Sequence, residues 1–419
     1  MAFPATASHG GSARLIAGDA VAVADQLLAE GRGGTFHLAH LDPPFGSEAD
    51  YARRRALIVD GQVCDFELPA YDDSDHGDLA GYLDGLYPVL CRYHELLAPE
   101  GALYLHIDYR RGPYLRALLD EIFGAENLIN EIVWAYGLGG SSRRRYQRKH
   151  DTIFYYARSA AHRFFRPPQE AATSSMLAGQ PKGATDTWSS ADQDDGSPIE
   201  RDWPDELVRK TLSNRDPERT GYPTQKPLAL ALRMVRASVP DRGQVLDLMA
   251  GSGTIGVAAC LLGHAVVLGD RGDPALDVAR GRLLAAGAAL TMSGVDEEGL
   301  WQDWVGPAPC RLQGDMAILQ AAPLPLPAGA VRAKPAVLAS LKAAAGSNGS
   351  ELFAAWGVGE VKADGALRVL AHWDQAALRQ RGPLLTSLSL PVAAANEALR
   401  WWAVDVLGRR WQGPLARSS

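Results

Sequence analysis

The sequence predicts an α/β protein built on a doubly wound, mostly parallel sheet. Short apolar runs alternate with helical stretches over residues 13–156, and the alternation returns at 227–268. A glycine-rich turn at 251–256 joins an apolar run to a helical stretch, which is typical of a βα connection. Because strands that alternate with helices usually pair in parallel, we expect both segments to contribute to one sheet.

The first segment begins with a strand, a helix and a strand. Residues 13–16 and 36–41 are short apolar runs, and residues 20–30 between them carry apolar side chains at helical spacing. The same reasoning predicts, in chain order, a helix at 82–97, a strand at 101–107, a helix at 114–123 and strands at 130–134 and 152–156. Between 159 and 221 the periodicity gives way to Gly, Ser, Pro and charge, which indicates long loops or an insertion.

The second segment supplies the rest of the sheet. We expect a helix at 227–238, a strand at 244–248, a helix at 254–262 and a strand at 265–268, with the sheet complete by about residue 289. The proline-rich residues 321–335 indicate an extended linker. Beyond them, alternation around Asp364-Gly365 predicts a hairpin. Seven of the ten tryptophans lie from Trp301 onward, so we expect a small tail domain that packs on itself.

Composition and charge exclude several classes of protein. Hydrophobic residues at 47% and charged residues at 22% are near globular averages, which excludes a disordered, collagenous or fibrous chain. The net charge is -7, so nucleic-acid binding depends on a local basic patch. The first twenty residues lack a signal-peptide pattern, and no uncharged run reaches the roughly 18 residues of a membrane span, so we expect a cytoplasmic protein. Four dispersed cysteines predict neither a disulfide framework nor a zinc site: Cys64, Cys91, Cys260 and Cys310.

The glycine-rich turn predicts a nucleotide-type cofactor. Gly251, Gly253 and Gly256 let a ligand approach the backbone and aim a helix N-terminus at it. A phosphate-binding P-loop is excluded because its lysine is absent, whereas a dinucleotide site stays open because Asp270 ends the next strand. Asp247 inside the preceding strand favours a cofactor with a sulfonium and an ammonium group, which describes S-adenosylmethionine (SAM).

The second candidate is the turn Asp42-Pro43-Pro44-Phe45, which follows the apolar run 36–41. Open α/β sheets bind ligands at the carboxyl ends of their strands. The two prolines leave the Asp42 carboxylate and the Pro43 carbonyl as a rigid pair of acceptors. An exocyclic amine that donates both N–H bonds to this pair would point its lone pair at a methyl donor. Phe45 offers a face for base stacking, worth roughly 1–3 kcal/mol.

Four segments together resemble the β class of amino-group DNA methyltransferases. Asp42 to Phe45 resembles the catalytic [DNS]PP[YFW] motif, and Asp247 to Thr254 resembles the SAM-binding D-x-F-x-G-S-G-T motif. Residues 221–227 (GYPTQKP) resemble the YPTQKP motif over the methionine end of SAM, and Gly18-Asp19 is similar to an element near the cofactor adenine. Their order, with the catalytic turn first, is that of the permuted β class, and the resemblance covers roughly residues 12–290.

The resemblance implies a permuted, Rossmann-like class I SAM-dependent methyltransferase sheet of seven strands, one of them antiparallel. It implies a catalytic domain at 12–158 and 221–290 with a target-recognition insertion at 159–220. Beyond the resemblance, the composition indicates a linker region at 291–335 and a C-terminal α+β appendage at 336–419. The expected reaction is methyl transfer from SAM to adenine N6 of a flipped base, with cytosine N4 as the alternative. A nicotinamide oxidoreductase and a catalytically silent DNA-binding protein are the rivals from other classes.

The resemblance also assigns site residues. The catalytic group is Asp42, Pro43, Pro44 and Phe45, and no metal is expected. Met249 and Phe45 replace the commoner Phe and Tyr of the family motifs, and both keep an apolar contact. His106 and Asp108 near a strand end are interpreted as ordinary polar groups. The expected cofactor-binding residues are Asp19, Thr224, Lys226, Pro227, Asp247, Met249, Ala250, Gly251, Gly253, Thr254 and Asp270.

A basic stretch predicts the contact with double-stranded DNA. Residues 141–167 carry eight Arg or Lys against one Asp, a local charge of +7. Residues 151–158 (DTIFYYAR) resemble a family segment whose aromatic residue contacts the flipped base. The acidic stretch 186–206 that follows stays unexplained. The predicted DNA-binding residues are Arg143, Arg144, Arg145, Arg148, Lys149, Tyr155 and Tyr156. A homodimer, a restriction or other defence-system subunit, and association with the nucleoid through the substrate are further expectations.

Overall fold

The computed structural model describes the sheet, its helices and parts of the C-terminal region. The described residues are 10–45, 50–59, 62–72, 78–136, 143–166, 168–170, 181–183, 186–189, 212, 216, 218–295, 302–303, 310–313, 316–319, 353–361, 367–374, 387–389, 399–405 and 410–417. The predicted linker 321–335, the Asp364-Gly365 turn and nearly all of the acidic stretch lie outside them. Most of the predicted recognition insertion 159–220 does so as well.

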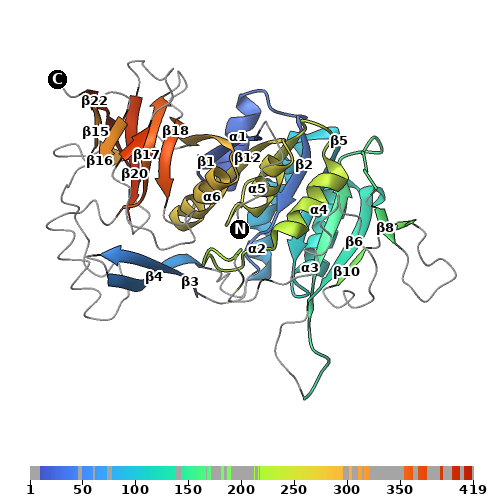
Figure 1. Ribbon diagram of the computed structural model, residues 1–419. Coiled ribbons are helices and arrows are strands. Elements are labelled where there is room, and N and C mark those ends of the chain that lie inside the picture. The colour runs from blue at the N-terminus through green and yellow to red at the C-terminus, as the bar shows by residue number, and fades with distance from the viewer. Residues whose placement is uncertain are drawn as a thin grey trace.

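One large sheet organises the molecule (Figure 1). Its first nine strands run in the order β10-β6-β7-β5-β2-β11-β12-β1-β13. All neighbours in this part pair in parallel except β7, which is antiparallel to both β5 and β6. The bounds are β1 Ser12–Ala17, β2 Phe36–Leu41, β5 Leu97–Ile107, β6 Leu128–Ala135, β7 His150–Ala157, β10 Thr187–Ser189, β11 Gln244–Asp247, β12 Ala265–Asp270 and β13 Ala289–Gly294. The predicted fold class is confirmed, although the sheet is larger than the seven strands expected.

Helices cover both faces of this sheet, which makes it doubly wound. Helices α1 (Ala20–Ala29), α2 (Leu79–Leu96) and α3 (Gly112–Phe123) pack on one face, followed by a short 3-10 turn at Ala125–Asn127. Helices α4 (Leu228–Ser238), α5 (Thr254–Leu261) and α6 (Asp273–Ala285) pack on the other (Figure 1). Burial of both faces explains why the central strands read as continuous apolar runs. Among the described helices, none has the length and apolarity that a bilayer span requires.

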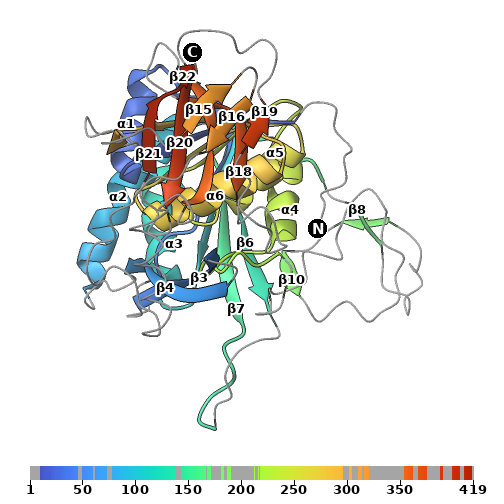
Figure 2. The ribbon, with the colours of Figure 1, turned by 60° about the vertical axis from the view of Figure 1, so that its left-hand side comes forward.

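A two-stranded hairpin follows the Asp-Pro-Pro-Phe turn and was not predicted from the sequence. It pairs β3 (Asp50–Val59) with β4 (Gln62–Asp72) in antiparallel register. The hairpin forms its own sheet, apart from the large one, and β4 passes close to α6 (Figure 2). A second small hairpin pairs β8 (Pro168–Glu170) with β9 (Pro181–Gly183) within the predicted insertion.

The C-terminal strands continue the large sheet. Strand β18 pairs antiparallel with β13, and the order runs on through β17, β20, β21 and β14. The bounds are β14 Gln302–Asp303, β17 Phe353–Val361, β18 Leu367–Asp374, β20 Leu399–Asp405 and β21 Arg410–Pro414. Strands β19 (Ser387–Ser389), β16 (Met316–Leu319), β15 (Cys310–Gln313) and β22 (Ala416–Arg417) form a four-stranded sheet beside them (Figure 2).

The predicted tail domain is therefore joined to the main sheet through strand pairing. Strands β14, β15 and β16 lie within the region predicted as a linker. They were not predicted, because strands this short carry little periodic signal. The described residues after 295 are strands, whereas helices as well as strands were expected. Trp356, Trp401 and Trp402 are buried, in agreement with a tail that packs around its tryptophans. The buried guanidinium of Arg280 in α6 lies 5.1 Å from the Trp402 ring centroid and connects the two parts.

Candidate active site

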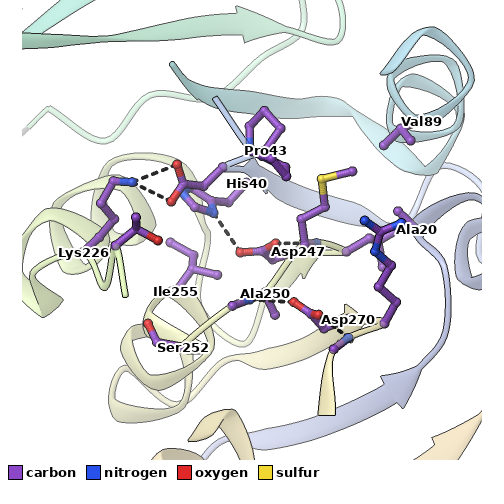
Figure 3. Close-up of a pocket in the computed structure, with 18 of the residues that line it drawn as sticks. Ala20, His40, Pro43, Val89, Lys226, Asp247, Ala250, Ser252, Ile255 and Asp270 are labelled. Carbon is purple, nitrogen blue, oxygen red and sulfur yellow. Dashed lines mark hydrogen bonds and ion pairs between the residues drawn. The ribbon is translucent and has the colours of Figure 1, made fainter. Parts of the chain in front are cut away.

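A cavity of about 790 Å³ lies at the carboxyl ends of four adjacent strands, β2, β11, β12 and β1 (Figure 3). Each strand ends at, or is soon followed by, an acidic residue that lines the cavity: Asp42, Asp247, Asp270 and Asp19. Most of the predicted catalytic and cofactor residues line it too. They are Pro43, Pro44, Phe45, Thr224, Lys226, Met249, Ala250, Gly251 and Thr254, whereas Pro227 and Gly253 stand just behind, each as the residue before a helix.

The Asp-Pro-Pro-Phe turn is held rigidly at the end of β2. The hydroxyl of Tyr82 donates to the Pro44 carbonyl at 2.9 Å, and that of Tyr93 donates to the His40 carbonyl at 3.2 Å. The Asp42 carboxylate accepts two hydrogen bonds from the Lys226 ammonium, at 2.9 and 2.7 Å. Burial favours the protonated acid, but Lys226, with the nearby imidazoles of His106 and His40, holds the pKa of Asp42 below its usual value.

The glycine-rich loop uses two carboxylates to fix its backbone. Asp247 accepts from the Met249 amide at 3.0 Å, and Asp270 accepts from the Gly251 amide at 2.9 Å. Gly253 has a φ of +70°, and a Cβ there would lie 2.9 Å from the Cβ of Ala279, so the turn requires glycine. Burial raises the pKa of Asp270 to about 6, against the backbone hydrogen bonds that favour its ionised form.

His40 is a site residue that the sequence reasoning missed. Its Nδ1 lies 2.8 Å from Asp247 Oδ2, so one imidazole bridges the catalytic strand β2 and the cofactor-type strand β11 (Figure 3). His40 lines the cavity, and Asp247 is 2% exposed. The sequence signal was weak: His40 is a polar residue between Ala39 and Leu41, and β2 carries a second partly buried histidine, His37, at its other end.

The Gly-Tyr-Pro-Thr-Gln-Lys-Pro segment is anchored from within the fold. The Gln225 side chain accepts from the Thr220 amide at 2.9 Å and donates to the Glu218 carbonyl at 2.9 Å. Thr224 has a φ of 56°, an unfavourable conformation for a β-branched residue that persists only where its surroundings enforce it. The segment therefore presents Thr224 and Lys226 to the cavity from a fixed backbone.

Arg282, also missed, ties this segment to the glycine loop. Its guanidinium donates to the Ser252 carbonyl at 2.9 Å and to Thr254 Oγ1 at 2.7 Å, and it lies 3.4 Å from a carboxylate oxygen of Glu218. The same Glu218 oxygen accepts from the Leu228 amide at the start of α4, at 2.8 Å. Burial lowers the pKa of Arg282 to about 10, but the side chain stays charged at neutral pH.

His106 supports the cavity from behind. It is fully buried, its ring centroid lies 5.8 Å from that of Phe45, and its Nε2 lies 3.0 Å from Asp151. Asp151 also accepts from the Tyr136 hydroxyl at 3.1 Å. Burial and the Lys226 charge lower the pKa of His106, in spite of Asp151. Asp108, by contrast, is a strand-end group that accepts from the Arg110 amide at 2.9 Å, as expected for an ordinary polar residue.

The predicted DNA-binding residues fall into two groups. The basic residues of 143–149 lead into β7 at the edge where β5 ends, and they project beyond the body of the molecule (Figure 2). Tyr155 and Tyr156 are 1% and 0% exposed and do not line the cavity. Tyr155 stacks on Tyr104 at 4.3 Å between ring centroids, and Tyr156 donates to Asp120. This placement differs from the expected contact with a base, because both faces of β7 are covered by the core.

Comparisons with known proteins agree with this geometry. A family model described as DNA methylase matches residues 36–279, more than half of the 419 residues. The type II methyltransferase M.ScaI of Streptomyces caespitosus is 27% identical over 210 residues, which are 48% of this chain and 66% of that protein. The type II methyltransferase M.EcaI of Enterobacter cloacae is 32% identical over 109 residues, 26% of this chain and 21% of that protein. The chain thus spans less than two thirds of the length of these relatives.

Two solved structures are among those similar to this chain. The M1.HpyAVI–SAM complex has a TM-score of 0.42 and 17% identity, and covers 65% of this chain and 98% of its own. The cytosine-N4-specific PvuII DNA methyltransferase has a TM-score of 0.44 and 11% identity, and covers 65% of this chain and 87% of its own. The family match includes the Asp-Pro-Pro-Phe turn, the Lys226 segment and the glycine-rich loop. The chain therefore belongs to the N6/N4 DNA methylase family.

Proposed function

We propose that this protein transfers a methyl group from SAM to the exocyclic amine of a base in double-stranded DNA. The observation that carries the proposal is the shared cavity, in which the Asp42 turn and the glycine-rich loop lie on adjacent strands. This proximity supports direct transfer from a cofactor at the glycine-rich loop to an amine at the Asp42 turn. Family membership supports this reading, and it gives the Asp42 and Lys226 segments a role that a nicotinamide oxidoreductase would leave unexplained.

The cavity residues fit SAM. Asp247 and Asp19 supply negative charge for a cationic cofactor, Asp270 ends the strand where a ribose-binding acid is expected, and Gly251 allows close approach to the backbone. SAM, when bound, supplies an electrophilic methyl group. The protein's own contribution is to hold the cofactor beside the Asp42 turn, and such orientation of two reactants accounts for a large part of many enzymatic accelerations.

The Asp42 turn would act on the amine. The Asp42 carboxylate and the Pro43 carbonyl accept its two N–H bonds, which localises the lone pair on nitrogen, while Phe45 stacks on the ring. Positive charge develops on that nitrogen during transfer, and the Asp42 carboxylate stabilises it. Asp42 is also placed to take the proton that nitrogen then loses. Because the amine is inaccessible inside a duplex, the base must flip into the cavity.

Adenine N6 is the proposed target. Cytosine N4 is kept as the alternative, because both amines suit the same two acceptors. The Mod subunit of the EcoP15I type III restriction-modification enzyme of Escherichia coli is 23% identical over 111 residues, 23% of this chain and 17% of that protein. On this likeness we propose a role in restriction-modification. We also propose that the protein acts on DNA in the cytoplasm.

A homodimer or a companion nuclease subunit is proposed as well. Either partner would appear as added mass in native mass spectrometry of the complex.

The test is direct. The purified protein is incubated with SAM and unmethylated mixed-sequence duplex DNA, which is then digested to nucleosides and analysed by mass spectrometry. We expect N6-methyladenine, and N4-methylcytosine would establish the alternative target. If neither methylated base forms while SAM binds, the proposed substrate is wrong; if SAM does not bind, the proposed cofactor is wrong.

A further inference from the structure

The ammonium group of Lys226 occupies the position that the reaction assigns to the target amine. It lies 2.9 Å from Oδ1 and 2.7 Å from Oδ2 of Asp42, contacts that are the two dashed lines at Lys226 in Figure 3. It also lies 5.1 Å from the centroid of the Phe45 ring. Both carboxylate oxygens of Asp42 are thus engaged by an N–H donor that also lies over the stacking face. Both partners are half-buried, with side-chain exposures of 15% for Lys226 and 20% for Asp42.

This arrangement competes with the target base. The proposed reaction needs one Asp42 oxygen for an amine N–H and the face of Phe45 for the base ring. Lys226 donates hydrogen bonds to the same carboxylate, and its ammonium makes a cation–π contact with the same ring. A base that enters the turn must therefore displace the ammonium from Phe45 and from at least one oxygen of Asp42.

The charge of Lys226 also opposes the chemical step. Methyl transfer places positive charge on the amine nitrogen, and the negative charge of Asp42 stabilises that positive charge. A second cation beside Asp42 weakens this stabilisation, because it neutralises the carboxylate. With Lys226 at 2.7 Å, the carboxylate already has a counter-ion. The ion pair is therefore a property of the DNA-free protein, and the reacting state needs it open.

Lys226 has the means to move without disturbing the fold. Its backbone carbonyl accepts from Thr254 Oγ1 at 3.3 Å, and the preceding Gln225 is anchored to Thr220 and Glu218, so the main chain stays fixed. The lysine stem is flexible and its ammonium is a compact charge that can exchange partners.

We propose that Lys226 is a placeholder for the target amine: it holds the Asp42 carboxylate and covers Phe45 until a flipped base displaces it. The placeholder keeps a buried carboxylate paired in the DNA-free protein, where an unpaired one would be costly. It also sets a threshold for base capture, because only a base that donates to Asp42 and stacks on Phe45 replaces both contacts of Lys226. This inference rests on the proposed function.

The test compares the full-length wild-type protein with Lys226→Gln and Lys226→Met under single-turnover conditions. Labelled SAM and unmethylated mixed-sequence duplex DNA give the transfer rate at saturating DNA and the half-saturating DNA concentration. If Lys226 is a placeholder, its removal should lower the half-saturating DNA concentration about fivefold, the equivalent of about 1 kcal/mol. An unchanged or raised half-saturating concentration in both variants would overturn the inference. Lys149→Gln is the matched control, since it removes the same charge on the predicted DNA side and should raise the half-saturating concentration instead.

A second readout is the affinity for SAM without DNA, measured by calorimetry, which also shows that each variant is folded. The inference is overturned if either variant loses more than about tenfold in the saturating rate, or if SAM affinity falls by that factor, because Lys226 would then act in the reaction or on the cofactor. If the wild-type protein transfers no methyl group, the proposed function itself fails and the inference falls with it.

Discussion

Replacement of Arg282 by methionine tests whether the site is held from behind. The change removes a buried guanidinium that donates to the Ser252 carbonyl and Thr254 Oγ1, at 2.9 and 2.7 Å, and that faces Glu218 at 3.4 Å. A hydrogen bond to a charged group contributes about 1.5–3 kcal/mol. Since Glu218 is 28% exposed and its contact is long, we count only the two loop hydrogen bonds, at the lower end, and expect the free energy of unfolding to fall by about 3 kcal/mol.

The assay is urea unfolding monitored by fluorescence, combined with calorimetric titration of SAM. The SAM affinity of Arg282→Met should fall at least about tenfold, because the glycine loop loses its anchor. A double-mutant cycle with Glu218→Gln should show a coupling of no more than about 1 kcal/mol, since most of the loss comes from the loop contacts. A change of less than about 1 kcal/mol in unfolding, together with an unchanged SAM affinity, would refute the anchoring role.

Three further predictions address the cofactor loop and the DNA surface. Burial raises the pKa of Asp270 to about 6, so its carboxylate protonates as the pH falls through that value. SAM affinity measured by calorimetric titration should therefore decline below about pH 6, and Asp270→Asn should remove this pH dependence. Gly253→Ala places a Cβ 2.9 Å from that of Ala279 at a φ of +70°, so thermal unfolding should show a loss of about 1–3 kcal/mol; an unchanged melting temperature would contradict the geometry. Replacing the three arginines of 143–145 by glutamine should reduce the slope of log affinity for DNA against log salt by up to about 2.7, whereas an unchanged slope would remove them from the interface.

Local sequence patterns predicted the sheet and the turns of the cavity well. The strand expected at 36–41 has those bounds in the structure, because a short, mostly apolar run between the polar residues Thr35 and Asp42 has few alternatives. The two motif turns were placed at strand ends for the same reason, and strand ends of a parallel sheet meet at one edge. The acidic residues Asp42, Asp247 and Asp270 therefore converge as expected.

Contacts between distant residues were not predictable. Lys226 and Asp42 are 184 positions apart, and no local pattern indicates that the lysine reaches the catalytic carboxylate. Arg282 was missed with its helix α6, although Asp273-Pro274 at the helix start was an available signal. The β3–β4 hairpin was missed because consecutive arginines at 53–55 and Pro69 interrupt strand alternation.

The central claim is that Asp42 holds the amine that receives the methyl group. We would measure transfer of labelled methyl from SAM to unmethylated duplex DNA by the wild-type protein and by Asp42→Ala, with SAM affinity determined for both. Alanine removes both the charge and the acceptor oxygens, so we expect that wild type labels DNA, and that the variant loses at least about 10²–10³-fold in rate while SAM affinity changes little. Equal labelling by both proteins, or no labelling by a wild-type protein that binds SAM, would contradict it.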